Sequence, residues 1–232
     1  MDVESLEPAC ALAGKLQAAA GLTKVGSQLF TAEGPQAVEK LAGLGFETFL
    51  DLKFHDIPNT VAGAVASAAR LPGVRLLTLH ALGGKAMMRA AREAVADKKN
   101  RPLLLGVTIL TSMDATDLNE VGISDSPGTR ALALARLAQE SGLDGVVASA
   151  HEIRAIRAAC GPKFLIVVPG VRPANSSAND QSRVATPAEA IQWGADYLVV
   201  GRPITSAPDP REAALSIAAE MAAAGSAFAI PS

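Results

Sequence analysis

Short strand-like runs alternate with helix-like segments along most of this chain, and this alternation constrains the fold more than any other feature of the sequence. Seven runs are predicted to be strands: Leu22–Gly26, Thr48–Lys53, Arg75–Ala81, Leu103–Leu110, Gly145–Ser149, Phe164–Gly170 and Tyr197–Gly201. Eight segments are predicted to be helices: Ser5–Ala20, Pro35–Leu44, Pro58–Ala69, Gly84–Ala96, Gly128–Ser141, Glu152–Ala159, Pro187–Trp193 and Pro210–Ala224. Such alternation is typical of parallel strands joined by right-handed crossover helices.

Eight successive units, each of one strand and one helix, close into a barrel. We therefore predict an α/β fold, a (β/α)8 TIM barrel, as one domain over residues 1–232. An open doubly wound sheet is the rival fold, but no G-x-G-x-x-G motif follows the first predicted strand. Because the chain begins with a helix, we expect its first strand to be largely missing. The barrel wall is then open there or filled by another segment.

Composition narrows the class of protein. Apolar residues make up 49% of the chain and aromatic residues only 3%, which suits aliphatic helices packed on a buried parallel sheet. With 21 basic and 23 acidic residues, the net charge of −2 favours a small-molecule substrate over nucleic acid or a membrane surface. The sequence shows no signal peptide and no membrane-spanning apolar run, so we expect a cytoplasmic protein. Cys10 and Cys160 have neither disulfide-framework nor zinc-site spacing.

Charged residues are concentrated where the second predicted strand ends. Asp51 and Lys53 are two positions apart, so regular alternation places both on one face, about 7 Å apart along the strand. Asp56 follows on a turn, and Pro58 is suited to open the next helix. An ordinary salt bridge at a strand end is the simplest interpretation. Three ionisable groups and a histidine within six residues nevertheless indicate a functional site, because such groups are costly to bury unpaired.

Other polar residues also follow predicted strands, and in barrel enzymes the chemistry lies at these carboxyl ends. The residues at the strand ends are Asp2, Lys24, Asp51, Lys53, His80, Thr111, Ser149, Arg172 and Arg202. His55 and His80 are interpreted as structural, because no recognisable serine or cysteine nucleophile accompanies them.

Two turns that combine glycine with arginine follow the last two predicted strands. Gly170 precedes Arg172 in one turn, and Gly201 precedes Arg202 in the other. Glycine allows close approach of backbone N–H groups to an anion, and a guanidinium provides paired donors. These turns therefore predict a phosphate site. The polar segment 171–183 between them is either an ordinary exposed loop or a lid over the ligand.

The ten residues Asp51-Leu52-Lys53-Phe54-His55-Asp56-Ile57-Pro58-Asn59-Thr60 resemble the signature of the orotidine 5′-phosphate decarboxylase family in its bacterial form. The resemblance extends from Asp2 to about Pro210. It implies that the chain converts orotidine 5′-monophosphate to uridine 5′-monophosphate and CO2, in pyrimidine synthesis, with no cofactor and no metal. It also implies a homodimer.

The resemblance implies a role for each matching residue. Lys24, Asp51, Lys53 and Asp56 would form an array of alternating charges, with Asp56 and Thr60 reaching the partner's site. Lys53 would stabilise the C6 carbanion and protonate it. The residues expected to bind substrate are Asp2 and Lys24 at the ribose, Thr60 at the partner's ribose, Thr111 at the pyrimidine, and Arg172, Gln181, Gly201 and Arg202 at the phosphate.

Two alternatives remain open at this point. A metal-dependent sugar-phosphate decarboxylase or epimerase on the same scaffold also uses D-x-K-x-x-D, and it would need Mg²⁺. The other alternative is an inactive barrel that only binds a nucleotide or a protein partner. The run from Phe54 to Thr60 favours the nucleotide decarboxylase over the metal-dependent enzyme. The presence of all four charged residues, Lys24, Asp51, Lys53 and Asp56, argues against an inactive barrel.

Overall fold

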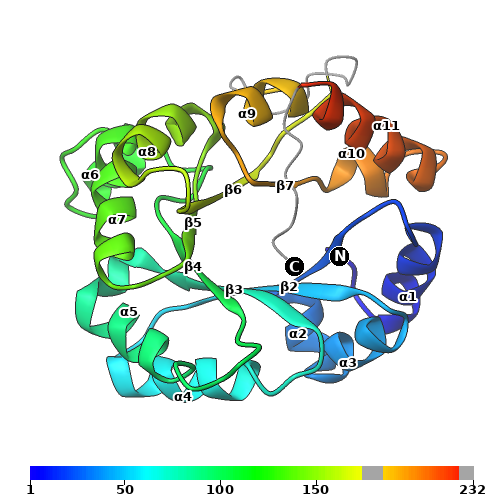
Figure 1. The fold of residues 1–232 in the computed structure, drawn as a ribbon, viewed down its shortest axis with the longest axis horizontal. Helices are drawn as coiled ribbons and strands as arrows, with labels where there is room; N and C mark the ends of the chain where they lie inside the picture. Colours follow the sequence, from blue (N-terminus) through cyan, green and yellow to red (C-terminus); the bar gives the residue numbers. More distant parts are fainter. Residues whose placement is uncertain (174–184, 225–232) are drawn as a thin grey trace.

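The computed structural model describes residues 1–173 and 185–224, which contain one parallel sheet. Its strands are β1 (Leu22–Gly26), β2 (Glu47–Phe54), β3 (Val74–His80), β4 (Leu103–Val107), β5 (Gly145–Val147), β6 (Leu165–Pro169) and β7 (Tyr197–Val199). The strands lie in sequence order, each parallel to the next. They bend into a nearly closed ring, so the predicted barrel fold is confirmed (Figure 1).

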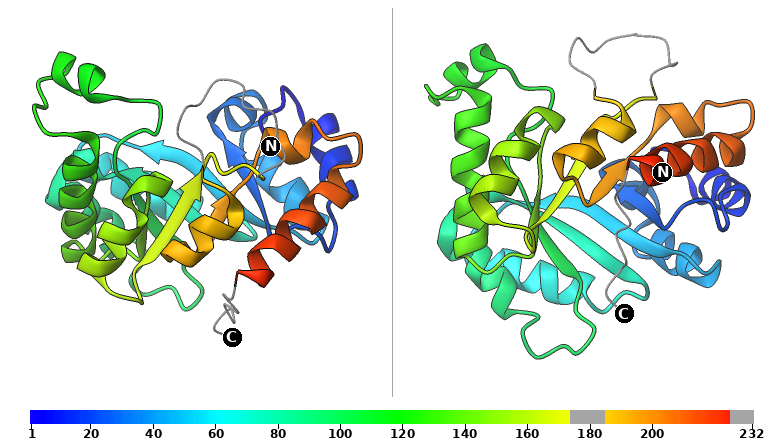
Figure 2. Two further views of the ribbon diagram at one scale, coloured as in Figure 1. Left: turned by 90° about the horizontal axis from the view of Figure 1, so that it is seen from above. Right: turned by 45° about the horizontal axis from the view of Figure 1, so that its top comes forward.

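Helices cover the outside of the ring, as two further views also show (Figure 2). They are α1 (Leu6–Lys15), α2 (Ser27–Glu33), α3 (Gln36–Gly43), α4 (Pro58–Ala68), α5 (Gly84–Glu93), α6 (Ala115–Glu120), α7 (Pro127–Glu140), α8 (Ile153–Cys160), α9 (Pro187–Trp193), α10 (Arg202–Thr205) and α11 (Pro210–Ala223). Two short 3₁₀ turns, η1 (Ala81–Gly83) and η2 (Ala150–Glu152), follow β3 and β5. No helix in the described part of the chain has the length and hydrophobicity needed to cross a membrane.

Several element ends differ from the prediction for local reasons. The first helix ends at Lys15 instead of continuing to Ala20, and Ala18 takes a positive φ of 59°, which a regular helix does not allow. Short helices α2, α6 and α10 were not predicted, because four to seven residues give little periodicity. For α6 the deciding feature is a capping box at Asp114.

The core has two parts because side chains alternate between the two faces of each strand. The larger cluster lies between the sheet and the helices. A smaller cluster joins Phe49, Leu76, Leu105 and Val167 from four different strands. Residues two positions further along β2 and β3 lie on the same face as this cluster, one step nearer the carboxyl ends. This is where the polar side chains of the site begin.

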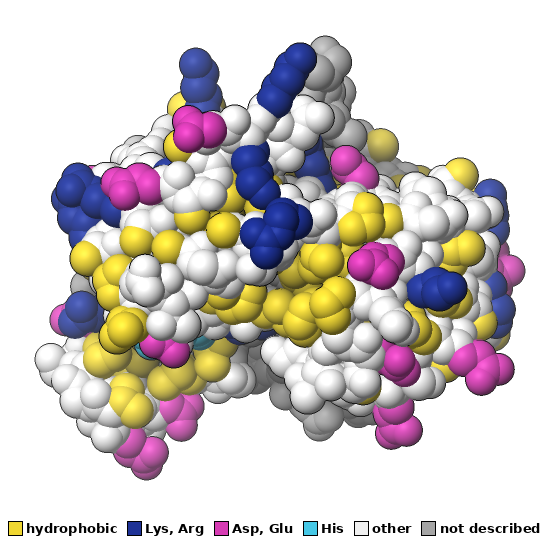
Figure 3. All heavy atoms as spheres, turned by 90° about the horizontal axis from the view of Figure 1, so that it is seen from below, with side chains coloured by type: hydrophobic (Ala, Val, Ile, Leu, Met, Phe, Trp, Pro, Cys, Tyr) yellow, Lys and Arg dark blue, Asp and Glu magenta, His cyan; other side chains and the backbone are white. Residues whose placement is uncertain are grey.

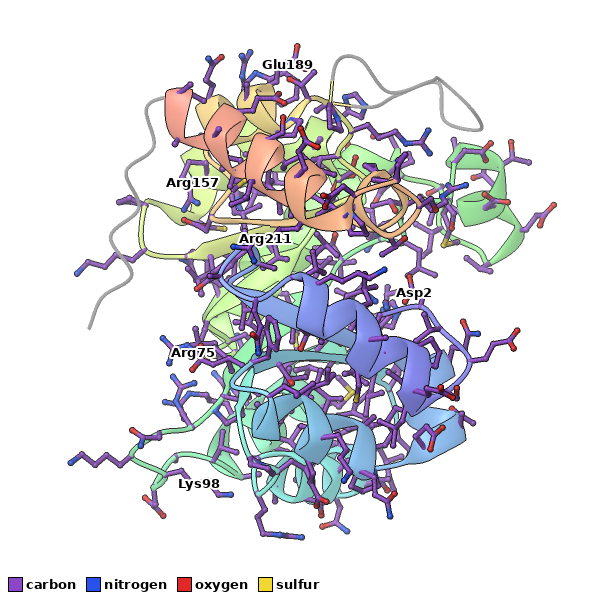
Figure 4. The ribbon with its side chains drawn as sticks, turned by 90° about the vertical axis from the view of Figure 1, so that its right-hand side faces the viewer. Asp2, Arg75, Lys98, Arg157, Glu189 and Arg211 are labelled. Carbon is purple, nitrogen blue, oxygen red and sulfur yellow. The ribbon has the colours of Figure 1, made fainter. Side chains whose placement is uncertain are left out.

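The ring is interrupted between β1 and β7, which share no ladder in the part of the chain that the structure describes. The nitrogen of Met1 donates to the carbonyl of Lys24 at 2.7 Å, so the N-terminal residues lie beside β1. Further out, α1 packs against α11. Arg211 of α11 donates to the carbonyl of Gln17 at 2.6 Å (Figure 4). The contacts of α1 with α11 thus join the two ends of the ring on its outside, while the N-terminal residues lie beside β1.

Candidate active site

Asp51 near the carboxyl end of β2 is the centre of the polar cluster, and only 8% of its surface is exposed. Its Oδ2 lies 2.8 Å from the Nζ of Lys53 and 3.5 Å from the Nζ of Lys24. Its Oδ1 accepts a hydrogen bond from the hydroxyl of Thr78 at 3.0 Å. Three neighbouring strands therefore each contribute one group to a buried carboxylate.

The backbone of β2 departs from regular strand geometry at Lys53. Leu50 pairs with Leu77 and Phe54 with Leu79, so β2 advances four residues while β3 advances two. Within this irregular stretch Lys53 has a positive φ of 51°. A conformation of this kind costs about 1–3 kcal/mol in a residue other than glycine. The side chains of Asp51 and Lys53 meet, as predicted, but they do so through this irregularity instead of regular alternation.

The charges around Asp51 control its ionisation. Burial alone would raise the pKa of this carboxyl group. The hydrogen bond from Lys53, the positive charges of Lys24 and Lys53, and the hydrogen bond from Thr78 outweigh burial, so the pKa lies below its ordinary value. Asp51 therefore stays ionised and keeps two ammonium groups close together in a poorly solvated position.

The same pattern continues towards the N-terminus. Asp2 has its Oδ1 3.4 Å from the Nζ of Lys24, and its side chain is 69% exposed. Negative and positive groups thus alternate in the order Asp2, Lys24, Asp51, Lys53. Fixed charges at the mouth of an apolar ring can stabilise charge that develops on a bound molecule, and an ammonium can also donate a proton to it.

Three other predicted residues are exposed on the same rim. Asp56 accepts a hydrogen bond from the backbone N–H of Ile57 at 2.6 Å, and no ion pair joins it to Lys53 within residues 1–173 and 185–224. Thr60 is exposed in the first turn of α4, and Thr111 is exposed beyond β4. The structure therefore does not bring Asp56, Thr60 or Thr111 into contact with the buried charges of the same chain.

The predicted phosphate residues follow β6 and β7. Arg172 is half-buried, and its backbone N–H donates to the carbonyl of Ala185 at 3.1 Å. Gly201 precedes α10, and a Cβ added there would meet no atom of the described residues within 4 Å. Arg202, the first residue of α10, is exposed. Gln181 and most of segment 171–183 lie outside the described residues, so the lid prediction stays a prediction.

Thr78 was not identified from the sequence, although it contacts both key residues of β2. It is fully buried, and besides donating to Asp51 it accepts a hydrogen bond from the backbone N–H of Lys53 at 2.9 Å. The available signal was a single polar residue in the apolar run from Leu76 to Leu79, on the same face as His80.

Two further titratable groups occupy the rim. The rings of His80 and His55 lie 5.4 Å apart, and burial followed by the nearby charges of His55 and Lys53 lowers the pKa of His80. Glu152 in η2 is 8% exposed and accepts a hydrogen bond from the backbone N–H of Ser149 at 2.9 Å. Burial raises the pKa of Glu152 to about 7, and the hydrogen bond only partly opposes this effect. Among the described residues no group of three or more His, Cys, Asp and Glu side chains is arranged to hold a metal ion.

Comparison with known proteins covers nearly the whole chain. A family model described as orotidine 5′-phosphate decarboxylase / HUMPS family matches residues 1–217. A relative from Halorhodospira halophila named orotidine 5′-phosphate decarboxylase is 55% identical over 225 residues, which span 97% of this chain and 95% of the relative. The relative of the same name from Chromohalobacter salexigens is 53% identical over 222 residues, spanning 96% and 94%. The crystal structure of orotidine 5′-phosphate decarboxylase from Lactobacillus acidophilus matches with a TM-score of 0.80 at 36% identity, covering 95% and 96% of the two chains.

Proposed function

Because this chain belongs to the orotidine 5′-phosphate decarboxylase / HUMPS family, we propose that it is a carbon–carbon lyase that converts orotidine 5′-monophosphate to uridine 5′-monophosphate and CO2 in pyrimidine synthesis. The observation that carries the proposal is the ion pair of the half-buried Lys53 with the buried Asp51 at the carboxyl end of β2. Lys24 beside Asp51 and Asp2 beside Lys24 extend this ion pair into a row of alternating charges. The expected cytoplasmic location remains a prediction.

Lys53 supplies the chemistry in this proposal. The bond from C6 of the pyrimidine to its carboxylate breaks, CO2 leaves, and the electron pair remains on C6 in an orbital that the ring cannot delocalise. The Lys53 ammonium stabilises this charge by proximity and then transfers one proton to C6. Asp51 orients Lys53 by accepting a hydrogen bond from its Nζ at 2.8 Å, and repulsion between Asp51 and the substrate carboxylate would be relieved as CO2 departs.

The remaining rim residues bind the nucleotide in this proposal. Asp2 and Lys24 hold the ribose hydroxyls from the β1 side, and Thr111 contacts the pyrimidine. The proposed phosphate-binding residues are Arg172, Gln181, Gly201 and Arg202. Support for the phosphate position comes from the open space at Gly201, which allows close approach of an anion to the backbone.

We further propose that two copies of the chain assemble into a homodimer in which Asp56 and Thr60 reach the partner's site. Asp56 is exposed and lies outside the charge array of its own chain. Exposed hydrophobic side chains lie beyond three successive strands: Ile57 at 67%, Leu82 at 42% and Leu110 at 38% exposure. Figure 3, which views the molecule from below relative to Figure 1, shows hydrophobic side chains gathered on the face seen there. Such a patch favours self-association.

The direct test is turnover of orotidine 5′-monophosphate in EDTA, followed by ultraviolet absorbance. We expect the wild-type chain to be active and Lys53→Ala to lose about 10³-fold or more, since both proton donation and charge stabilisation are removed. Lys85→Ala is the matched control, because Lys85 forms an exposed ion pair with Glu140 on the outer helices. If the wild-type chain is active with Mg²⁺ but loses turnover in EDTA, the metal-dependent alternative is favoured. If there is no turnover with or without metal, the inactive barrel is favoured.

A mixing experiment tests the dimer. Lys53→Ala and Asp56→Ala are each expected to be nearly inactive alone. After mixing and exchange of subunits, about one quarter of all sites would combine an intact Lys53 with an intact Asp56 from the partner. Activity should therefore recover to about a quarter of the wild-type value. If the mixture stays inactive although subunits exchange, Asp56 does not act across an interface.

A further inference from the structure

We propose that Thr78 is a positioning residue that holds both the carboxylate of Asp51 and the backbone of Lys53 for catalysis. This inference rests on the proposed function, because it assigns to Thr78 the geometry of the groups that carry the reaction. Thr78 lies on β3, adjacent to β2, and is fully buried below the rim. It does not reach the rim surface, so its effect must pass through Asp51 and Lys53.

The hydrogen-bond pattern around the Thr78 hydroxyl has one consistent assignment. The backbone N–H of Lys53 can only donate, so the Thr78 oxygen accepts from it at 2.9 Å. The single hydroxyl proton is then directed to Oδ1 of Asp51, 3.0 Å away. With Oδ1 occupied in this way, Oδ2 faces both Lys53 and Lys24. Thr78 thus determines which carboxylate oxygen meets the ammonium groups.

The bond to the backbone has a second effect. Because β2 slips against β3 between Leu50 and Phe54, the chain at Lys53 does not continue the regular ladder. The Thr78 hydroxyl serves as acceptor for the Lys53 N–H at this point and supports the positive φ of 51°. A β-branched side chain has little χ1 freedom, so this acceptor is rigidly placed.

Two other fully buried threonines show that this role is specific to position 78. Thr48 in β2 has a buried hydroxyl with no hydrogen-bond partner among the residues that the structure describes. Thr108, just beyond β4, donates to the backbone carbonyl of Val147 at 3.1 Å. Neither hydroxyl contacts a charged side chain. Thr48→Val is therefore a matched control for Thr78→Val, since both changes exchange a buried hydroxyl for a methyl group of similar size.

The test combines steady-state kinetics with hydrogen exchange of the Lys53 amide measured by NMR. In Thr78→Val we expect kcat to fall about 10- to 100-fold, the size of losing one hydrogen bond to a charged group, with KM nearly unchanged. The Lys53 amide should exchange at least about 10-fold faster, because its acceptor is gone. Thr78→Ser should restore kcat and amide protection to within a few-fold of wild type. Thr48→Val should behave as wild type in both measurements.

Several results would overturn the inference. A Thr78→Val variant with wild-type kcat, or with an equally protected Lys53 amide, would show that the hydroxyl does not position the site. Equal damage in Thr78→Ser and Thr78→Val would assign the effect to packing of the methyl group. If Thr78→Val does not fold, an unprotected Lys53 amide in the wild-type chain would itself refute the proposal. Since amide exchange needs no substrate, it tests whether Thr78 holds the Lys53 backbone even if orotidine 5′-monophosphate is not turned over.

Discussion

The carboxyl ends of β1–β3 and of β6–β7 lie on one rim but are organised in opposite ways. On the first side every charged group of the array has a partner, with Asp51 buried and bonded to Lys53 and Thr78. On the second side Gly201 faces open space, and the exposed Arg202 makes no ion pair with any other residue in the described part of the chain. The first side is assembled before ligand arrives, whereas Gly201 and Arg202 on the second side are exposed.

This difference matches the two tasks of the proposed reaction. Groups that stabilise charge in a transition state work best when they are already oriented, because no reorganisation is then needed during the reaction. A side chain that binds a charged ligand does so more tightly when it has no ion pair beforehand, since an existing ion pair would have to break before the ligand binds. The comparison therefore predicts that substitutions on the two sides change different kinetic constants.

The largest effect is expected from Asp51→Asn, which breaks the preassembled side. Two ammonium groups would lose their shared counter-ion, so kcat/KM for orotidine 5′-monophosphate should fall about 10³-fold or more.

The contribution of Asp51 to folding stability should also depend on pH. The folded-state pKa of Asp51 is lowered, so its contribution is present above the ordinary carboxyl pKa and is lost as pH falls through the lowered value. Urea unfolding of the wild type and of Asp51→Asn at pH 7 and at pH 3 measures the stability that the ionised Asp51 contributes.

The control for that substitution is Glu140→Gln, which removes the acid of an exposed ion pair with Lys85. We expect it to leave kcat/KM unchanged and stability within about 0.5 kcal/mol. If Asp51→Asn kept near-wild-type turnover, the preassembled side would have no catalytic importance and the comparison would fail.

A smaller and more selective effect is expected from Arg202→Ala on the open side. Losing a guanidinium that pairs with phosphate should lower kcat/KM for orotidine 5′-monophosphate about 100-fold, mainly through KM. The nucleoside orotidine carries no phosphate, so its slow turnover should not change in this variant. Asp51→Asn should instead reduce turnover of both substrates. An equal loss with nucleotide and nucleoside would show that Arg202 does not bind phosphate.

The smallest effect is expected from Glu152→Gln, on η2 between the two sides. Because burial raises the pKa of Glu152 to about 7, the folded chain loses stability as pH rises from about 4.5 to 7. Glutamine does not titrate and still offers an oxygen to the Ser149 N–H. We expect the variant to gain on the order of 1–3 kcal/mol over wild type at pH 8 and little at pH 4. Urea unfolding at both pH values checks this, and a gain that is equal at both would contradict it.

The fold was predictable because strand and helix periods repeat along most of the chain. The charged segment was predictable because Asp51 and Lys53 directly follow an apolar strand. The positive φ of Lys53 was not, since it depends on how β2 pairs with β3. Thr78 was missed for the same reason: its importance comes from a neighbour 27 positions away, Asp51, and no local pattern reports that contact. The exposure of Asp56 likewise followed only from the structure.

The interruption between β1 and β7 also has a consequence for the order of folding. Within residues 1–173 and 185–224 each strand pairs only with its sequence neighbours, so the sheet can grow by closing short loops one after another. The contact of Arg211 with Gln17 spans 194 positions and carries the largest loop-closure entropy of the hydrogen bonds described above. We expect α11 to dock on α1 late in folding and to detach early in unfolding. Detachment would disturb Asp2 and Lys24 on the β1 side first, while Thr78, Asp51 and Lys53 would keep their mutual contacts longer.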